Sequence, residues 1–247
     1  ALNIAQLDKL VRLHYTKSEE VFSVSDLKHD LAREALKYHN FEPPVEISSL
    51  ADIPAGTGVG SSSCYLIGLL KVLREYRGEF ISSQELAEEA CDIELNILNK
   101  GIGKQDQYMA AFGGLTTMNI DKNGIVKVGS IDMLEEDKYD LASKTHLYYT
   151  GFRRGAEDIL SKQDNAMKEK ADSETRINVE ESLDGIKSIG YSILDAVRDL
   201  DFDSFGRMLD EHWQLKKKMS NKVSIPKVDS VYKTVKENYS VLGGKII

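Results

Sequence analysis

The stretch DIPAGTGVGSSS at residues 52–63 constrains the fold more than any other part of this 247-residue sequence. Three alternate positions are glycine (Gly56, Gly58 and Gly60), and three serines then lead into an apolar helical run, CYLIGLLKVLREY. Glycine permits positive φ and a close approach of the backbone to a ligand. A helix N-terminus adds unpaired N–H groups and the positive end of its dipole. The pattern therefore predicts a strand, loop and helix whose loop cradles an anion, and phosphate is the simplest one.

Two well-known phosphate loops do not fit the stretch. No Gly-Lys-Ser/Thr follows the glycines, as a Walker A loop requires, and their order is G-x-G-x-G-S rather than G-x-G-x-x-G. A merely flexible connection stays open as an alternative, but three glycines and three serines so close together favour a binding loop. A hydrolase nucleophile among Ser61–Ser63 is disfavoured, because no acid–base histidine stands near them in the sequence.

Composition and charge exclude several classes of protein. The net charge is −8, with 41% hydrophobic and 29% charged residues, and no basic stripe interleaves with aromatics as in nucleic-acid binders. No apolar run approaches the roughly 20 residues of a membrane span, and we expect no signal peptide. Cys64 and Cys91 lie in helix-periodic segments and are expected to be buried free thiols, which suits a reducing cytoplasm. We expect a cytoplasmic protein without nucleic-acid or membrane partners.

The succession of elements predicts an α+β fold. Strands are expected within 2–16 and at 45–50 and 145–151, and a hairpin over 114–131 turns at Asn123-Gly124. Helices are expected at 30–40, 64–76, 83–98 (opened by a capping box, Ser82 to Glu85), in a short turn within 101–114, and across 152–219 and 226–239. The shift toward long helices predicts two domains, 1–143 with a mixed sheet and 144–247 rich in helix.

The glycine-rich stretch resembles a motif of the GHMP kinases, the family of galactokinase and of homoserine, mevalonate and phosphomevalonate kinases. Their second conserved motif is P-x-x-x-G-L-G-S-S-A, and this sequence has PAGTGVGSSS at 54–63, with Val59 for Leu and Ser63 for Ala. The resemblance implies an ATP-binding loop around the phosphates and Ser62 as a Mg²⁺ ligand. The implied loop residues are Pro54, Gly56, Thr57, Gly58, Val59, Gly60, Ser61, Ser62 and Ser63.

Two carboxylates behind this loop extend the resemblance. Glu94 falls in the helix after the capping box, and Asp106 follows twelve residues later in the context G-x-x-D-Q. In the family these positions hold a Mg²⁺ ligand and the presumed catalytic base, and a carboxylate suits both tasks. Alternatively, Glu94 is one more solvated helix glutamate and Asp106 a helix N-cap. Their order and spacing favour the site.

A longer similarity narrows the implied substrate. GIGKQDQYMAAFGGL, HLYYTGFRRGAEDIL and EHWQLKKKMSN with VLGGKII resemble the branch that contains D-glycero-D-manno-heptose 7-phosphate kinases. The resemblance implies the two-domain GHMP kinase fold and an enzyme that transfers the γ-phosphate of ATP to the anomeric C1 hydroxyl of that sugar phosphate, giving the 1,7-bisphosphate. Fucose, galactose or N-acetylhexosamine remain alternative substrates. A non-catalytic sensor of sugar or ATP on the same fold is a further alternative.

The phosphate of such a sugar needs cations. Lys104 is expected to contact the substrate or to favour the ionised form of Asp106, and Arg153 and Arg154 offer guanidinium groups suited to phosphate. Each has an ordinary surface residue as its alternative. Two further glycine-rich motifs of the family do not occur in the 247 residues, and we expect them beyond Ala1 and beyond Gly243-Gly244-Lys245. A monomer and a homodimer both stay open.

Overall fold

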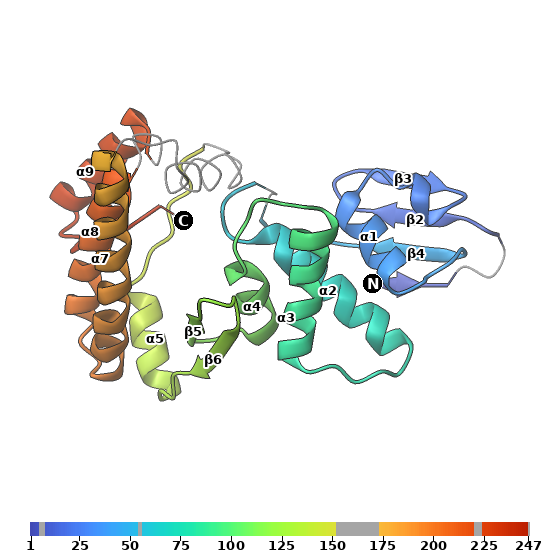
Figure 1. The fold of residues 1–247 in the computed structure, drawn as a ribbon, viewed down its shortest axis with the longest axis horizontal. Helices are drawn as coiled ribbons and strands as arrows, with labels where there is room; N and C mark the ends of the chain where they lie inside the picture. Colours follow the sequence, from blue (N-terminus) through green and yellow to red (C-terminus); the bar gives the residue numbers. More distant parts are fainter. Residues whose placement is uncertain (5–7, 54–55, 152–172, 220–223, 247) are drawn as a thin grey trace. The chain divides into compact units, whose positions relative to one another are not determined.

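The structure is a computed structural model that describes residues 1–4, 8–53, 56–151, 173–219 and 224–246. The polypeptide forms two compact units, Ala1–Thr116 and Thr117–Ile247. The domain boundary predicted between residues 143 and 144 stays a prediction, because a compact unit and a family's domain need not end at the same residue. Mixed strands and many helices (Figure 1) confirm the predicted α+β class.

The first unit contains a four-stranded mixed sheet. The strands are β1 (Leu2–Asn3), β2 (Val11–His14), β3 (Ser18–Val21) and β4 (Val45–Ser48), in the order β1-β4-β2-β3. β2 and β4 are parallel, with Val11 opposite Val45, while the two outer strands pair antiparallel. The parallel pair is possible because α1 (Asp30–Tyr38) lies between β3 and β4 in sequence and provides the crossover.

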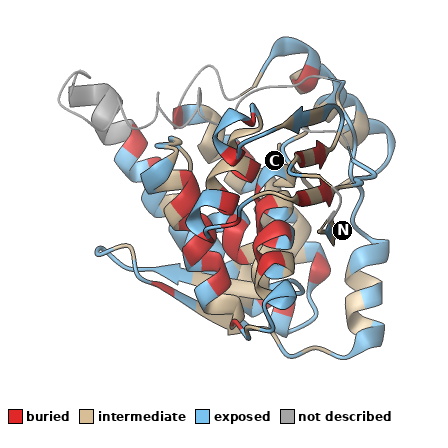
Figure 2. Ribbon diagram, turned by 90° about the vertical axis from the view of Figure 1, so that its right-hand side faces the viewer, coloured by how far each residue is buried: buried red, intermediate tan, exposed pale blue. Residues whose placement is uncertain are grey.

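Helices supply most of the apolar core of the first unit. They are α1, α2 (Ser61–Tyr76), α3 (Ser83–Cys91), a π-helical segment (Asp92–Ile97) and α4 (Gln105–Phe112), with a 3₁₀ turn at Val24–Asp26. Alternate strand residues and one stripe of each helix are buried together, and Figure 2 colours these positions red. The fully buried members include Val11, Leu13, Val45, Ala35, Leu36, Leu66, Leu70 and Leu73. α2, α3 and α4 lie against one another, which matters for the site.

Local signals placed these elements correctly. The capping box forms as predicted: the Ser82 hydroxyl accepts from the Glu85 N–H, and the Glu85 carboxylate accepts from the Ser82 N–H. The predicted helices at 30–40 and 64–76 correspond to α1 and α2, although α2 already begins at Ser61, and the predicted strand at 45–50 corresponds to β4.

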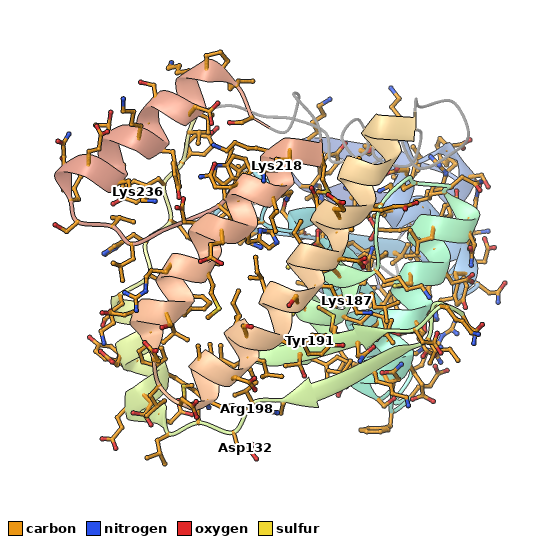
Figure 3. The ribbon with its side chains drawn as sticks, turned by 60° about the vertical axis from the view of Figure 1, so that its left-hand side comes forward. Asp132, Lys187, Tyr191, Arg198, Lys218 and Lys236 are labelled. Carbon is orange, nitrogen blue, oxygen red and sulfur yellow. The ribbon has the colours of Figure 1, made fainter. Side chains whose placement is uncertain are left out.

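The second unit begins with a hairpin and continues in helices. β5 (Thr116–Ile120) and β6 (Val126–Ser130) confirm the predicted hairpin, with Gly124 at φ +77° in its turn. The helices are α5 (Glu135–Ser143), α7 (Ser173–Arg198), α8 (Phe202–Met219) and α9 (Pro226–Asn238). α7 and α8 lie side by side, and Trp213 is fully buried. Lys236 of α9, labelled in Figure 3, forms an ion pair with Asp210 of α8.

The predicted strand at 145–151 and the predicted burial of Cys64 are wrong, and one predicted helix lies outside the described residues. Residues 145–151 were predicted as a strand, but within the described part of the chain they pair with no strand and are mostly exposed. The β propensity of Leu and Tyr needs a neighbouring strand to act on. Cys64 is exposed rather than buried, because it points away from the apolar stripe of α2, whereas Cys91 is buried. The predicted helix over 152–172 lies outside the described residues.

No helix among the described residues is both long enough and apolar enough to cross a membrane.

Candidate active site

The glycine-rich loop leads into α2 with a backbone that needs its glycines. Gly56, Gly58 and Gly60 have φ of +76°, +84° and +68°, a region that L side chains rarely adopt. Gly60 is the N-cap of α2, and as a glycine it has no side chain with which to cap the helix. The loop therefore leads into a 16-residue helix whose first N–H groups receive no side-chain hydrogen bond from the N-cap residue. That arrangement suits an anion.

Glu94 is completely buried and is surrounded by hydrogen-bond donors. Its Oε2 accepts from the Ser63 hydroxyl at 3.0 Å and from Gln107 Nε2 at 2.5 Å. Its Oε1 lies 3.3 Å from Lys100 Nζ. The donors come from α2, from α4 and from the loop after the π-helical segment, so the carboxylate joins three parts of the first unit. A solvated helix glutamate, the alternative raised by the sequence, is excluded.

The π-helical segment explains how a residue of a polar helix end becomes buried. After α3 the backbone widens, Leu98 N–H donates to Ile93 O, and Lys100 N–H donates to Glu94 O, both 2.9 Å. This wider turn brings Lys100 back to Glu94 through both its backbone and its side chain. Single π-helical turns within helices are frequent at functional sites.

Asp106 lies beside the glycine loop. It is in the first turn of α4, two residues after the N-cap Lys104, so it is not itself the N-cap. A Cβ atom placed on Gly60 would lie 3.4 Å from Cβ and Cγ of Asp106 and 3.5 Å from Oδ2. The pKa of Asp106 is raised, first by loss of hydration and second by the negative charge of Glu94. The carboxyl still reaches solvent, so a ligand can approach it.

The three serines at the start of α2 have different surroundings. Ser63 is buried and donates to Glu94, Ser61 is half-buried, and Ser62 is exposed. Helical geometry explains the difference, because successive side chains point about 100° apart around the axis. The role of Ser62 as a metal ligand stays a prediction, while the structure brings its neighbour Ser63 to the predicted metal carboxylate.

Other predicted site residues have varied positions. Gly56–Ser63 lie together in the loop and the first turn of α2, whereas Pro54, Arg153 and Arg154 lie outside the described residues. Lys104 is half-buried at the start of α4. Lys100 and Gln107 were missed. Gln107 adjoins Asp106 in the D-Q pair, which is a usable signal, but nothing in the sequence singled out Lys100.

The carboxylate oxygens near the glycine-rich loop could supply some of the ligands of a Mg²⁺ ion. Among the described residues, no group of three or more His, Cys, Asp or Glu side chains could hold a metal by itself. Mg²⁺ is commonly held by one or two carboxylates together with substrate phosphates and water. Glu94 and Asp106 provide such carboxylates behind a loop suited to phosphate. Glu94 would have to share or exchange one of its present donors.

Comparison with known proteins finds similarities for part of the first unit and for longer stretches of the chain. Residues 27–114 match the family model described as the GHMP kinases N terminal domain. A D-glycero-alpha-D-manno-heptose 7-phosphate kinase of Campylobacter jejuni is 29% identical over 197 residues, which is 80% of this chain and 56% of that protein. An L-fucokinase/L-fucose-1-P guanylyltransferase of Bacteroides fragilis is 25% identical over 206 residues, 80% of this chain and 20% of that protein. The chain thus spans little more than half of the first relative and a fifth of the second.

Solved structures share the fold. The crystal structure of a D-glycero-D-manno-heptose 1-phosphate kinase from Bacteroides thetaiotaomicron aligns with a TM-score of 0.69 at 24% identity, covering 94% of this chain and 69% of that one. A putative sugar kinase from Campylobacter jejuni aligns with a TM-score of 0.68 at 22% identity, covering 96% of this chain and 68% of that one.

The positive φ of Gly60 gives a first prediction. Gly60→Ala should lower the free energy of unfolding by about 1–2 kcal/mol, because an L residue is strained in the left-handed region. Because the loop is the predicted ATP-binding loop, the strain at the N-cap of α2 should also weaken nucleotide binding. Denaturant unfolding and titration with a fluorescent ATP analogue measure the two effects.

Gly78→Ala is the matched control for that variant. Gly78 has the same φ of +68°, lies after α2, and has open space where its Cβ would be. It should lose similar stability and keep nucleotide binding. Equal nucleotide affinity in both variants would contradict the placement of the loop at the binding site.

The raised pKa of Asp106 gives a second prediction. Its carboxyl should titrate above the ordinary range of aspartate, and Glu94→Gln should lower this pKa without normalising it, because desolvation is the larger cause. Carbon-13 NMR of the aspartate carboxyls measures the shift. Glu88→Gln, an exposed neighbour on α3, should change little. A normal Asp106 titration in the unaltered protein would contradict the described environment.

Proposed function

We propose, from the premise that residues 27–114 form a GHMP kinase N-terminal domain, that this protein is an ATP-dependent kinase acting on a hydroxyl group of a sugar. The observation that supports it most is the proximity of the Asp106 carboxyl to Gly60 in the loop. Phosphoryl transfer needs a group that orients the attacking hydroxyl close to the bound phosphates. The glycine-rich loop and the segment around Asp106 are separate in the sequence, but they lie next to each other in the structure. Phosphoryl transfer requires such a phosphate-binding loop and an acceptor carboxylate at the same place.

Each part of the site has a distinct task in this proposal. The backbone N–H groups at the start of α2 and in the loop bind the β- and γ-phosphates, where their partial positive charge stabilises the developing negative charge. Asp106 accepts the proton of the attacking hydroxyl and aligns it. A bound Mg²⁺ would neutralise charge on the phosphates, and Glu94, with Ser62 or Ser63, is the chain's contribution to holding it.

The raised pKa of Asp106 is consistent with a base. A carboxylate with a higher proton affinity than usual takes a hydroxyl proton more readily, provided that it is still ionised at the working pH. Desolvation supplies that affinity, and it increases further when a substrate excludes water from the loop.

We propose D-glycero-D-manno-heptose 7-phosphate as the substrate, phosphorylated at the anomeric C1 hydroxyl. The name of the Campylobacter jejuni relative supports it, as does the similarity that extends over 80% of the chain. Among the described residues, Lys104 is the one that we propose to contact the phosphate of the sugar. Arg153 and Arg154 are proposed for the same role. Fucose is the second candidate, because the Bacteroides fragilis relative is named as an L-fucokinase. A cytoplasmic location is proposed with this function, since ATP and sugar phosphates are found there.

A third prediction concerns Asp106→Asn. Turnover should fall at least about 1,000-fold, in the range lost when general-base catalysis is removed, while ATP affinity stays within about twofold because the amide conserves the shape.

The stability of the Asp106→Asn protein should not fall at neutral pH. A raised native pKa means that the native state binds the proton more tightly than the unfolded chain, so the carboxyl lowers stability as pH rises from the ordinary pKa through the raised one. The amide removes that cost.

Coupled ADP release and thermal unfolding measure both properties of this variant. Asp121→Asn, in the β-hairpin turn of the second unit, is a control of the same chemistry. Near-normal turnover by Asp106→Asn would contradict the proposed role.

A fourth prediction concerns the substrate. Among sugars offered with Mg²⁺ and ATP, D-glycero-D-manno-heptose 7-phosphate should give the highest kcat/KM, and the same heptose without its 7-phosphate should give at least about tenfold less, because a charged phosphate contact contributes at least 1.4 kcal/mol. L-fucose, galactose and N-acetylhexosamines complete the panel. A preference for one of them would replace the substrate proposed. Tight ATP binding without ADP release on any sugar would favour the sensor.

A further inference from the structure

The carboxylate of Glu94 already has a cation beside it. Lys100 Nζ is 3.3 Å from Oε1, and Oε2 is occupied by the two neutral donors Ser63 and Gln107. The side chain of Glu94 is completely buried and that of Lys100 is 18% exposed, so water screens this pair weakly. The ammonium therefore neutralises the carboxylate where the proposed function needs it to meet Mg²⁺.

The same ammonium is held from a second side. Asp30 Oδ2, at the start of α1, lies 3.8 Å from Lys100 Nζ. Its side chain is 48% exposed, so its charge is hydrated and costs little to leave unpaired. Lys100 thus lies between a buried carboxylate and a solvated one, and Asp30 draws it away from Glu94. The pKa of His29, the neighbour of Asp30, is lowered chiefly by burial, while the charges of Asp30 and Glu19 oppose this shift and the charge of Lys100 adds to it least.

We propose that Lys100 is a counter-ion that competes with the divalent cation for Glu94, and that Asp30 sets the strength of this competition. The inference rests on the proposed function, because it concerns the metal carboxylate of that site. Two cations on one carboxylate repel each other strongly in a poorly hydrated place. Lys100 therefore stabilises the metal-free protein and weakens metal binding, and it keeps Glu94 from being an unpaired buried charge before nucleotide and metal arrive.

This role predicts a combination of effects that a purely structural lysine would not produce. Lys100→Met should lower the melting temperature of the metal-free protein, because Glu94 loses its counter-ion. It should at the same time lower the Kd for Mn²⁺ about tenfold, because the competing charge is gone. Asp30→Asn should act in the opposite direction and raise the Kd about threefold, since Lys100 then stays on Glu94. A structural lysine would give a loss of stability and weaker metal binding together.

The experiment titrates the whole chain with Mn²⁺ at pH 8, alone and with β,γ-methylene-ATP, and measures free Mn²⁺ by electron paramagnetic resonance. Lys37→Met is the matched control, since Lys37 lies on α1 in an exposed pair with Glu34 and its loss changes the net charge equally. It should leave the Kd within about twofold. Thermal unfolding without metal accompanies each titration.

The outcomes separate this inference from the proposed function. If the unaltered protein binds Mn²⁺ with the nucleotide analogue, and Lys100→Met binds it no more tightly than Lys37→Met, the inference is overturned and the kinase assignment stands. If Lys100→Met does not fold, Asp30→Asn decides, and an unchanged Kd overturns the inference. If the unaltered protein binds no Mn²⁺ even with the analogue, both proposals fail.

Discussion

The burial of one carboxylate organises the first unit of this protein. Glu94 has no access to water, so its oxygens must find partners within the protein, and an unpaired buried charge would cost several kcal/mol. The partners are Ser63 at the start of α2, Gln107 in α4 and Lys100 after the π-helical segment. Because these groups must converge on one point, α2, α4 and the end of α3 are fixed relative to one another. The Gly60 loop and Asp106 acquire their proximity from the same constraint.

The two carboxylates of the site are placed in contrasting surroundings. Glu94 is enclosed by donors and a cation, whereas Asp106 reaches solvent beside a loop whose glycines leave room for it, and its pKa is raised. Pairs of acidic groups in different environments commonly divide the tasks of an active site between them. In the proposed function one carboxylate binds a metal and the other accepts a proton. The inference on Lys100 adds to this division of tasks, because it proposes that Glu94 pairs with the Lys100 ammonium until a metal ion replaces it.

Much of the fold was accessible from local signals. The capping box of Ser82 and Glu85, the turn at Asn123-Gly124 and the alternating burial of β2 and β4 rest on contacts between residues close in sequence or on a simple period. The prediction of a strand at 145–151 was wrong because a strand forms only where a neighbouring strand pairs with it, and the local sequence does not show whether such a neighbour exists. Helix α5 was not predicted, since its acidic first turn has little apolar periodicity. The site was predictable in its motifs, Gly56–Ser63, Glu94 and Asp106, because their residue types and order carry the resemblance.

The sequence by itself determined the properties that follow from residue types and their spacing. These are the α+β class, the loop whose backbone needs glycines, the similarity to GHMP kinases and the presence of the two carboxylates. The tertiary structure decided the burial of Glu94, the identity of its partners and the proximity of Gly60 to Asp106. These depend on groups 31 and 13 residues away from Glu94, brought together by the packing of α2 against α4. The π-helical segment Asp92–Ile97 then brought Lys100 back to Glu94, a position that no sequence motif had indicated.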